Sequence, residues 1–418
     1  MTRAVGSQAG APLAAPAGLA APSGRPGRID QVVPSFAGRD AIGVHVLHVR
    51  DTLRAAGYAS DIWAMDVLPD MRRQARPLTE LPTRTMPATW LLFHHSIGTP
   101  VVDLLCDRAE PLIVDYHNVT PAALVDRWEP ALHAELVLGR DQLAPLAARA
   151  FFALADSAYN EQELRASGFR HTDVVPPLFA LESFEVDVDE HVLERLRDGP
   201  RARQGTHWLF VGRLAPHKAP HELVKALACY RRLYDPEAVL HLVGNPLGTT
   251  YPRALARYVQ RLGLADAVEI TGSIGAGELA AYYRAADVFV CASAHEGFCV
   301  PVVEAMHLGV PVVAQAAAAV PETVDGGGVV LDDRSPLALA VAVHRVLGDE
   351  DVRRRLIRAG RHRAASFALG RSRARLLAAL ERAVTVAGGA ARPAASVGED
   401  GDGAPLPAGT LGDGRAGR

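Results

Sequence analysis

The stretch ASAHEGFCVPVVEAMHLGVPVVA, residues 292–314, decides the fold class of this 418-residue chain. The apolar run DVFVCAS, which leads into it, predicts a strand, and the triplet His-Glu-Gly at 295–297 predicts a loop. The residues that follow predict a helix with Pro301 in its first turn, where proline is tolerated because that position has no intrahelical partner for an N–H group. A strand that passes through a short loop into a helix is the unit of a parallel α/β sheet.

The same rhythm of strand and helix continues on both sides of this stretch. The first half offers the strands IDQVVPS, ASDIWAM, TWLLFHHS, PLIVDYHN, AFFALADS and TDVVPP, and the second half offers HWLFVGRL, AVLHLVGN, AVEITGS, DVFVCAS, VPVVAQ and GGVVL. Helical spacing of apolar residues fills the segments between them, including 40–56, 128–150, 222–233 and 252–262. The segment 182–205 is charged and bears Pro and Gly, which predicts a linker with a short helix.

Two Rossmann-like, doubly wound α/β domains are therefore expected, at residues 28–200 and 201–368. A C-terminal helix at 369–387 follows, which could cross back to the first domain. Residues 1–27 and 388–418 are rich in Ala, Gly and Pro and are expected to be a disordered extension and tail. In doubly wound sheets, ligands bind outside the carboxyl ends of the strands.

Composition excludes several classes of function. The chain has 44 Lys+Arg against 47 Asp+Glu, a formal charge of -3, whereas nucleic-acid binders carry a basic excess. Its four cysteines form no C-x-x-C pair, which favours a reducing cytoplasm over a disulfide framework or a zinc site. No apolar run is long enough for a spanning helix, so we expect a soluble, cytoplasmic protein and leave peripheral membrane contact open.

The loop and helix at 295–304 suit an anionic ligand that carries hydroxyl groups. The backbone N–H groups at the start of the helix form an anion site, assisted by the helix dipole. Glu296 and Glu304 bracket this site, and a carboxylate can accept hydrogen bonds from two neighbouring hydroxyls. The alternative is that Glu296 only caps the helix and that Glu304 lies on the surface. The residues expected to offer the N–H groups are Gly297, Phe298, Cys299 and Val300.

The segment VGRLAPHK, residues 211–218, follows the first strand of the second half. Gly212 turns the chain there and leaves Arg213 and Lys218 at the crevice. Two cations can neutralise a pyrophosphate and stabilise it as a leaving group. The alternative is that both are ordinary solvent-exposed charges.

Together, G-R-x4-K and the later E-G-F-x2-P-x2-E-A-M-x2-G-x-P-V-V-A resemble glycosyltransferase family 4. The resemblance implies the GT-B fold and a retaining enzyme that takes a UDP- or GDP-linked sugar as substrate, with no metal or other cofactor. It implies that Glu296 contacts the transferred sugar, that Glu304 holds the ribose, and that Arg213 and Lys218 bind the diphosphate. The family commonly has Gly directly after this Lys, where the chain has Ala219, so the geometry of this loop is less certain.

Two segments of the first half add candidates. The loop SFAGRDAIG, residues 35–43, resembles the glycine loop of the GT-B N-terminal domain, and Gly43 would allow it to approach the donor phosphates; the alternative is an ordinary turn. The segment DYHNVTP, residues 115–121, is similar to one in part of family 4, where a histidine faces the reacting sugar, which points to His117. A core or capping role is the alternative.

Two further features bear on the acceptor and on a metal. His94 and His95 end a strand and could contact the acceptor, but the histidines show no spacing typical of a metal site. The triplet Asp187–Asp189 has the D-x-D pattern of manganese-dependent transferases, yet it lies in the linker, where Asp189 suits a helix N-cap. We therefore predict no metal.

The hypothesis from sequence is transfer of a sugar to a hydroxyl acceptor, a glycan precursor or a small metabolite. Attack occurs on the face that the leaving group departs from, and the leaving phosphate takes the acceptor's proton. Glu296, Lys218, Arg213 and His117 are the expected catalytic residues. The alternatives are another enzyme on the same scaffold, such as a sugar-nucleotide epimerase or a phosphorylase, and a non-catalytic partner subunit.

Overall fold

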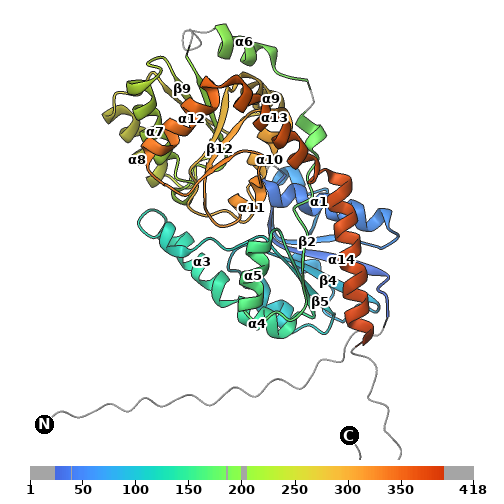
Figure 1. The fold of residues 1–418 in the computed structure, drawn as a ribbon. Coiled ribbons are helices and arrows are strands. Elements are labelled where there is room, and N and C mark those ends of the chain that lie inside the picture. The colour runs from blue at the N-terminus through green and yellow to red at the C-terminus, as the bar shows by residue number, and fades with distance from the viewer. Residues whose placement is uncertain (1–23, 39, 185–186, 199–204, 390–418) are drawn as a thin grey trace, which may run out of the picture.

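The computed structural model describes residues 24–38, 40–184, 187–198 and 205–389 (Figure 1). Most of the predicted N-terminal extension and C-terminal tail lies outside the described residues, as does the predicted domain boundary at residue 200. Within the described ranges the chain forms two α/β units that lie one above the other in Figure 1, each built on its own parallel sheet.

The N-terminal domain has a seven-stranded sheet in the order β3-β2-β1-β4-β5-β6-β7, with every pairing parallel. Its strands are β1 (Arg28–Phe36), β2 (Ile62–Val67), β3 (Arg76–Pro77), β4 (Thr89–His95), β5 (Leu112–Tyr116), β6 (Phe152–Ala155) and β7 (Thr172–Val174). All six predicted strands are present. The sequence missed β3, whose two residues pair with the start of β2.

The C-terminal domain has a six-stranded parallel sheet in the order β10-β9-β8-β11-β12-β13. Its strands are β8 (His207–Val211), β9 (Val239–Val243), β10 (Val268–Gly272), β11 (Val288–Cys291), β12 (Val312–Gln315) and β13 (Val329–Leu331). The order of the strands reverses at β8 and β11, which pair with each other: β9 and β10 follow on one side, and β12 and β13 on the other. The loops that carry Lys218 and Glu296 follow these two strands, so the fold places them side by side at the topological switch point.

The helices cover both faces of each sheet (Figure 1). In chain order they are α1 (Ala41–Ala55), α2 (Val101–Cys106), α3 (Pro130–Asp141), α4 (Leu143–Arg149), α5 (Ala158–Ala166), α6 (Glu190–Asp198), α7 (Pro220–Leu233), α8 (Thr250–Arg261), α9 (Ala276–Ala285), α10 (Val300–Leu308), α11 (Val320–Val324), α12 (Pro336–Gly348), α13 (Glu350–Ala365) and α14 (Leu369–Gly389). The single helix expected over 128–150 is two helices, α3 and α4. Gln142 lies between them, and its side-chain amide bonds both backbone groups of Thr99.

Helix α14 leaves the C-terminal domain and packs along the N-terminal sheet (Figure 1). It begins at Leu369, where the sequence places the C-terminal helix. The buried residues of α14 recur at helical spacing and belong to the same apolar cluster as residues of β1, β4 and β6, namely Leu376, Ala379, Leu380, Ala383, Ile29, Trp90 and Leu154. An ion pair between Arg382 and Asp173 adds a polar contact beside them. The last helix therefore completes the core of the first domain.

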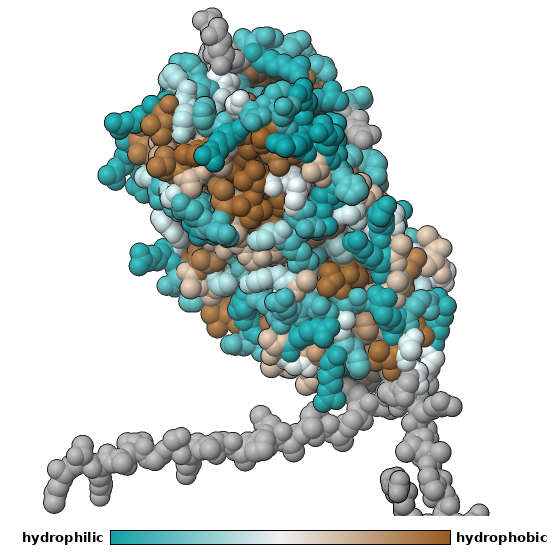
Figure 2. Space-filling view, in the orientation of Figure 1, coloured by the Kyte–Doolittle hydropathy of each residue, from teal (hydrophilic) through white to brown (hydrophobic). Residues whose placement is uncertain are grey.

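Figure 2 shows a face that is mostly hydrophilic, with the largest group of hydrophobic residues on the C-terminal domain in the upper half. Among the helices of the described residues, none combines the length and the apolar character needed to cross a lipid bilayer.

Candidate active site

Lys218 and Glu296 form the centre of the C-terminal half of the site. Lys218 Nζ lies 2.5 Å from Glu296 Oε2, and the Ser293 hydroxyl donates to Glu296 Oε1 at 2.7 Å. Burial alone would lower the pKa of Lys218, but the Glu296 carboxylate outweighs burial and raises this pKa. The Ala294 N–H also donates to the His217 carbonyl at 2.7 Å, which ties the two loops together. The sequence predicts separate contacts with phosphate and sugar, whereas the structure brings these two side chains into direct contact.

At the start of α10 the backbone N–H groups are unbonded, whereas the carbonyls just before the helix accept hydrogen bonds. The carbonyls of Glu296, Gly297 and Phe298 accept hydrogen bonds from the Ala319 N–H, the Ser157 hydroxyl and the Thr323 hydroxyl, respectively. Within the described part of the chain, the backbone N–H groups of residues 297–300 donate no hydrogen bond. A helix start with unbonded N–H groups favours an anion.

Glu304 lies inside the C-terminal domain, so the interpretation of Glu304 as a surface residue is wrong. Its side chain is 8% exposed, and the Tyr283 hydroxyl donates to Glu304 Oε2 at 2.6 Å. Burial raises the pKa of Glu304 to about 7, because the hydrogen bond from Tyr283 offsets only part of the cost of burying the charge. Near neutral pH this carboxyl is poised between its two protonation states.

Arg213 faces the glycine loop of the N-terminal domain. It directly follows Gly212, whose φ of 152° belongs to the region that favours glycine, and its side chain is exposed. Burial raises the pKa of Asp40 at the start of α1, while the Gly43 N–H and the positive charges of Arg213 and His117 oppose that rise. These electrostatic effects place Arg213 and His117 near the same carboxyl group.

Gly43 has a structural reason to be glycine. A Cβ at this position would lie 1.7 Å from the Ala37 carbonyl oxygen, so the loop can close only without a side chain. The Gly43 N–H donates to Asp40 Oδ1 at 2.6 Å, which caps α1. The predicted close approach is thus made by the loop to itself, and contact of Gly43 with donor phosphates remains a prediction.

His117 is held as an imidazolium at the carboxyl end of β5. Its Nδ1 lies 3.0 and 3.1 Å from the two oxygens of Asp156, and its Nε2 lies 2.9 Å from His94 Nδ1. His94 Nε2 in turn faces Gln31 Oε1 at 2.9 Å, which assigns the His94 proton to Nε2 and leaves Nδ1 as an acceptor. Both ring nitrogens of His117 therefore donate.

The charge on His117 agrees with its surroundings. Burial alone would lower its pKa, but the carboxylates of Asp156 and Asp115 outweigh burial and raise it to about 9. Burial lowers the pKa of the neighbouring His94 well below its ordinary value, so this second ring is neutral. A protonated His117 cannot accept a proton and can only donate hydrogen bonds.

His45, His94, Asp115 and His117 lie close enough together to suggest a metal site, because one ligand atom from each lies within 4.8 Å of the others. The hydrogen bonds argue against that use. The Leu178 N–H donates to His45 Nδ1 at 2.8 Å, so the His45 proton is on Nε2, where it is donated to Asp115 at 2.9 Å. In this network the Nε2 atoms of His45 and His117 both carry protons, so a cation could bind them only if both protons were released.

Two other features from the sequence have structural roles. His95 is fully buried and bonds the Gly139 carbonyl through Nε2 at 2.9 Å, and burial lowers its pKa to about 4. This position does not suit the acceptor contact considered for it. Asp189 accepts from the Val192 N–H at 3.1 Å and caps α6, as expected.

The two domains meet directly at the loop that carries Glu296. His295 Nε2 lies 2.6 Å from Asn118 Oδ1, and the Ser157 hydroxyl donates to the Gly297 carbonyl at 2.8 Å. A Cβ on Gly297 would lie 2.7 Å from that of Asn118, so glycine is required for this approach. The Glu322 carboxylate also accepts from the first N–H groups of α5, at 2.8 and 3.2 Å. The His117 and Glu296 segments are therefore adjacent.

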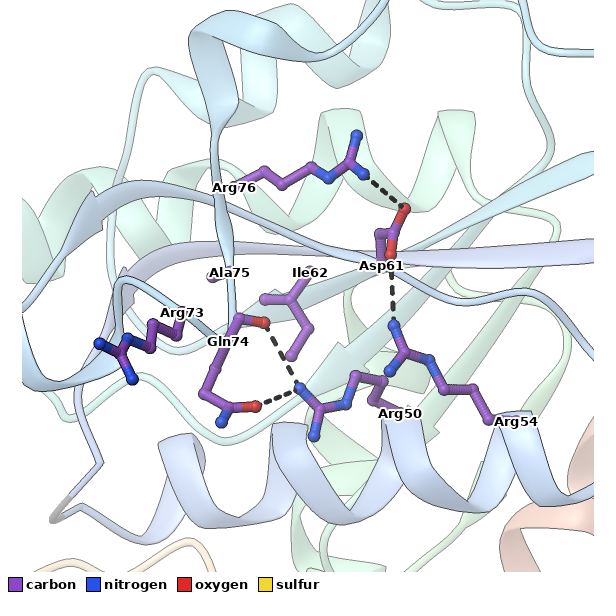
Figure 3. A pocket seen from close by; sticks show the side chains of 8 residues that line it. All are labelled: Arg50, Arg54, Asp61, Ile62, Arg73, Gln74, Ala75 and Arg76. Carbon is purple, nitrogen blue, oxygen red and sulfur yellow. Dashed lines mark hydrogen bonds and ion pairs between the residues drawn. The ribbon is translucent and has the colours of Figure 1, made fainter.

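A separate cationic cavity of about 300 Å³ lies at the edge of the N-terminal sheet (Figure 3). Its guanidinium groups are largely used within the protein: Arg50 bonds Gln74, while Arg54 and Arg76 pair with Asp61. Arg73 is exposed and points away from the other labelled side chains in Figure 3. We assign this cavity no part in the site.

Several residues of the site were not predicted from the sequence: Gln31, His45, Asp115, Asp156, Tyr283 and Ser293. A signal was available for Gln31 and Asp115, since each interrupts an apolar strand and is buried. A buried polar side chain in a strand must find a partner, so these positions could have been flagged. The contacts between these residues could not be predicted from the sequence.

Comparison with known proteins agrees with this fold. Residues 197–363 match the family model described as "Glycosyl transferases group 1". A D-inositol 3-phosphate glycosyltransferase from Geodermatophilus obscurus is 36% identical over 302 residues, which is 68% of this chain and 64% of that protein. A protein of the same name from Kineococcus radiotolerans is 32% identical over 70% of this chain and 71% of its own. The chain belongs to the group 1 glycosyltransferases, which confirms the predicted family resemblance.

Solved structures confirm the GT-B fold. HepE from Anabaena, in complex with UDP, has a TM-score of 0.63 at 19% identity and covers 85% of this chain and 100% of its own. Sucrose-phosphate synthase from Thermosynechococcus elongatus has a TM-score of 0.66 at 21% identity, over 86% and 100%. Among its curated relatives, the chain spans 64%, 54%, 58% and 61% of four proteins that share the D-inositol 3-phosphate glycosyltransferase name.

Proposed function

We propose that this protein transfers a sugar from a UDP- or GDP-linked donor to a hydroxyl acceptor, with retention of configuration and without a catalytic metal. One observation carries the proposal: the Lys218 ammonium and the unbonded N–H groups of residues 297–300 converge beside Glu296, next to the protonated His117. A site of this kind suits a diphosphate whose negative charge grows as it leaves. The names of the relatives and the UDP bound to HepE support the same reading.

Each side chain has a role in this proposal. Lys218, Arg213 and the N–H groups of Gly297 to Val300 stabilise the departing diphosphate. Glu296 orients the transferred sugar, and Glu304 accepts hydrogen bonds from the ribose. His117 donates from Nε2 to His94 and places its positive charge beside the reacting sugar.

The proton of the acceptor goes to the leaving phosphate. His117 cannot take it, because both of its ring nitrogens already carry protons. The two oxygens of Glu296 are engaged by Lys218 and Ser293, so this carboxylate is not a free base or nucleophile. Attack on the face that the diphosphate leaves is consistent with both facts.

The acceptor is proposed more broadly than the donor, as a glycan precursor or a small metabolite that bears a hydroxyl group. D-inositol 3-phosphate is the first acceptor to test, because several relatives carry it in their names. All four cysteines are free thiols, which supports a reducing cytoplasm as the site of action.

The test is a panel of UDP- and GDP-sugars with D-inositol 3-phosphate and other hydroxyl acceptors, in buffer that contains EDTA. We expect a new glycosidic bond with the anomeric configuration of the donor, measured by NMR. Conversion of the donor sugar without an acceptor would identify an epimerase, and phosphate-dependent release of a sugar phosphate would identify a phosphorylase. If no nucleotide raises the melting temperature of the protein, a non-catalytic subunit is favoured.

A further inference from the structure

Two thiols flank the Glu296 loop. Cys291 is the last residue of β11, and Cys299 is the N-cap of α10. The two sulfur atoms and a carboxylate oxygen of Glu296 all lie within 4.8 Å of one another. Cys291 is 1% exposed, whereas Cys299 is partly exposed, so a small molecule in the site can reach Cys299 first.

Cys299 has an unusual backbone conformation. Its φ and ψ are 78° and 66°, in the left-handed region, and its side chain makes no capping hydrogen bond. A residue with a Cβ is less stable by about 1–2 kcal/mol in this conformation, a cost that glycine avoids. Strained positions of this kind cluster at functional sites. The thiol is thus held at a strained point of the proposed donor site, beside a second thiol.

The same three residues do not suit a cation. One oxygen of Glu296 is 2.5 Å from the Lys218 ammonium, and the other accepts the Ser293 hydroxyl. A metal ion would have to displace or lie beside a positive charge, which is unfavourable at short range. Oxidation of the two thiols adds no charge and requires no displacement of Lys218.

We propose that Cys291 and Cys299 are a reversible oxidation site, in which a hydroperoxide converts the two thiols into one disulfide. One thiol of the pair, as the thiolate, attacks the peroxide oxygen and becomes a sulfenic acid, releasing water when the oxidant is hydrogen peroxide. The sulfur of the other cysteine then attacks the sulfenic sulfur and expels its oxygen as a second water. The sum is two thiols and one H2O2 giving one disulfide and two waters, and a dithiol reductant reverses it.

The disulfide closes a loop that contains Ser293, His295 and Glu296. It also draws the N-cap of α10 toward the end of β11, which shifts the N–H groups and the carboxylate that the proposed function requires. A displacement of about 1 Å in such a site costs roughly 100-fold in rate. This effect on rate rests on the proposed function, whereas formation of the disulfide does not.

The experiment treats the reduced full-length protein with hydrogen peroxide, blocks the remaining thiols and maps the peptides by mass spectrometry. We expect a disulfide between Cys291 and Cys299, with Cys106 and Cys229 still free. Transfer activity should fall about 100-fold and return with dithiothreitol. Finding Cys291 and Cys299 both still reduced, or Cys299 oxidised only to sulfinic acid, would overturn the proposal.

Matched variants separate this site from general oxidation. Cys291→Ala should keep its activity through a brief peroxide treatment that inactivates the wild type, or lose it without recovery as Cys299 is overoxidised. The Cys106→Ser, Cys229→Ser double variant should respond as the wild type does. Equal and reversible inactivation of Cys291→Ala contradicts the proposal, as does protection of both thiols by Zn²⁺ alone, which identifies a metal site. If no transfer is detected even before oxidation, the proposed function fails, but the peptide map still decides the disulfide.

Discussion

The two halves of the site are built in different ways. In the C-terminal domain, Ser293, Glu296 and the start of α10 come from one continuous stretch, and Lys218 joins them from the neighbouring strand. In the N-terminal domain, His117 depends on Asp156 and on His94, which lie 39 and 23 positions away in the sequence. One half is a local motif with one long-range partner, and the other is a network assembled by the sheet.

This difference predicts how each half of the site responds to substitution. A motif within one loop and helix keeps its geometry as long as the loop does. A network across neighbouring strands fixes the protonation of His117 through several residues, none of which need contact a ligand. Substitutions should therefore act directly on binding and turnover in the C-terminal half, and through the charge of one ring in the N-terminal half.

The largest effect is expected for Lys218→Ala. It removes the ammonium proposed to stabilise the leaving group and leaves the buried Glu296 carboxylate without its ionic partner. Turnover should fall about 100- to 1000-fold, in steady-state assays of transfer.

Lys225→Ala is the matched control, because Lys225 pairs with Glu222 on the half-exposed face of the next helix. It should leave turnover almost unchanged. Glu296→Ala should also lose activity by orders of magnitude with its fold intact by circular dichroism. Near-normal transfer by both Lys218→Ala and Glu296→Ala would refute the assignment of the site.

Asp156→Asn tests the hydrogen-bond network in the N-terminal half of the site. Without this carboxylate the pKa of His117 should fall from about 9, so the imidazolium is lost at lower pH. Turnover at pH 8 should fall about 100-fold, and the alkaline limb of the pH–rate profile should move toward neutral.

The stability of Asp156→Asn should change with pH in a defined direction. His117 has a raised pKa, so its ion pair contributes fully below its unfolded value near 6.5, and the contribution is lost as pH rises through about 9. Burial raises the pKa of Asp156, so the pair is also lost in acid as this carboxylate takes up a proton. The deficit of the variant should therefore be largest close to pH 6.5 and shrink on both the alkaline and the acid side, in urea unfolding. Asp126→Asn, which removes the partner of the more exposed His133, should show neither change. An unchanged pH–rate profile for Asp156→Asn would mean that the charge on His117 plays no part.

In the C-terminal half of the site, Glu304→Gln should change nucleotide binding and protein stability in opposite directions. The raised pKa of Glu304 means that burial of its charge destabilises the folded state, from the ordinary value of 4.5 up to about 7 and fully above that. The variant should melt a few degrees higher than the wild type at pH 8, with little difference near pH 4. Nucleotide binding, measured by calorimetry, should weaken about 10-fold through loss of the charged acceptor.

The control for this experiment is Glu194→Gln on the exposed face of α6, which should change neither quantity. Weaker stability of Glu304→Gln at pH 8 would show that a favourable partner of the carboxylate outweighs the cost of burying its charge.

The smallest effect is expected for Ala219→Gly. Ala219 follows Lys218 with φ 48° and ψ 42°, so the loop keeps a left-handed residue despite having a side chain there. Glycine should raise the free energy of unfolding by up to about 1 kcal/mol, measured in urea. The opposite change, about 1 kcal/mol of destabilisation, is expected for Ala228→Gly inside α7. If Ala219→Gly destabilises the protein, the left-handed conformation of Ala219 does not strain the backbone.

The sequence was sufficient for the order of the strands along the chain and for the segments around Lys218 and Glu296, because strand rhythm and motif spacing are local properties. It was not sufficient for the contact between these two side chains, which depends on the pairing of β8 with β11. Nor could it show that Asp156 and His94 fix the protons of His117, since their proximity arises only when β4, β5 and β6 align. The need for glycine at positions 43 and 297 could not be predicted either: a Cβ would meet the Ala37 carbonyl at Gly43 and the Asn118 side chain at Gly297.

Helix α14 has a consequence for synthesis of the protein. The apolar face of the N-terminal sheet around Trp90 and Leu154 is covered by a helix that leaves the ribosome after both domains have been translated. The N-terminal domain is thus completed late, and one apolar face of its sheet stays uncovered while the C-terminal domain is translated. Nascent chains halted before Leu369 should hold an exposed apolar surface that attracts chaperones, whereas chains released after residue 389 should not.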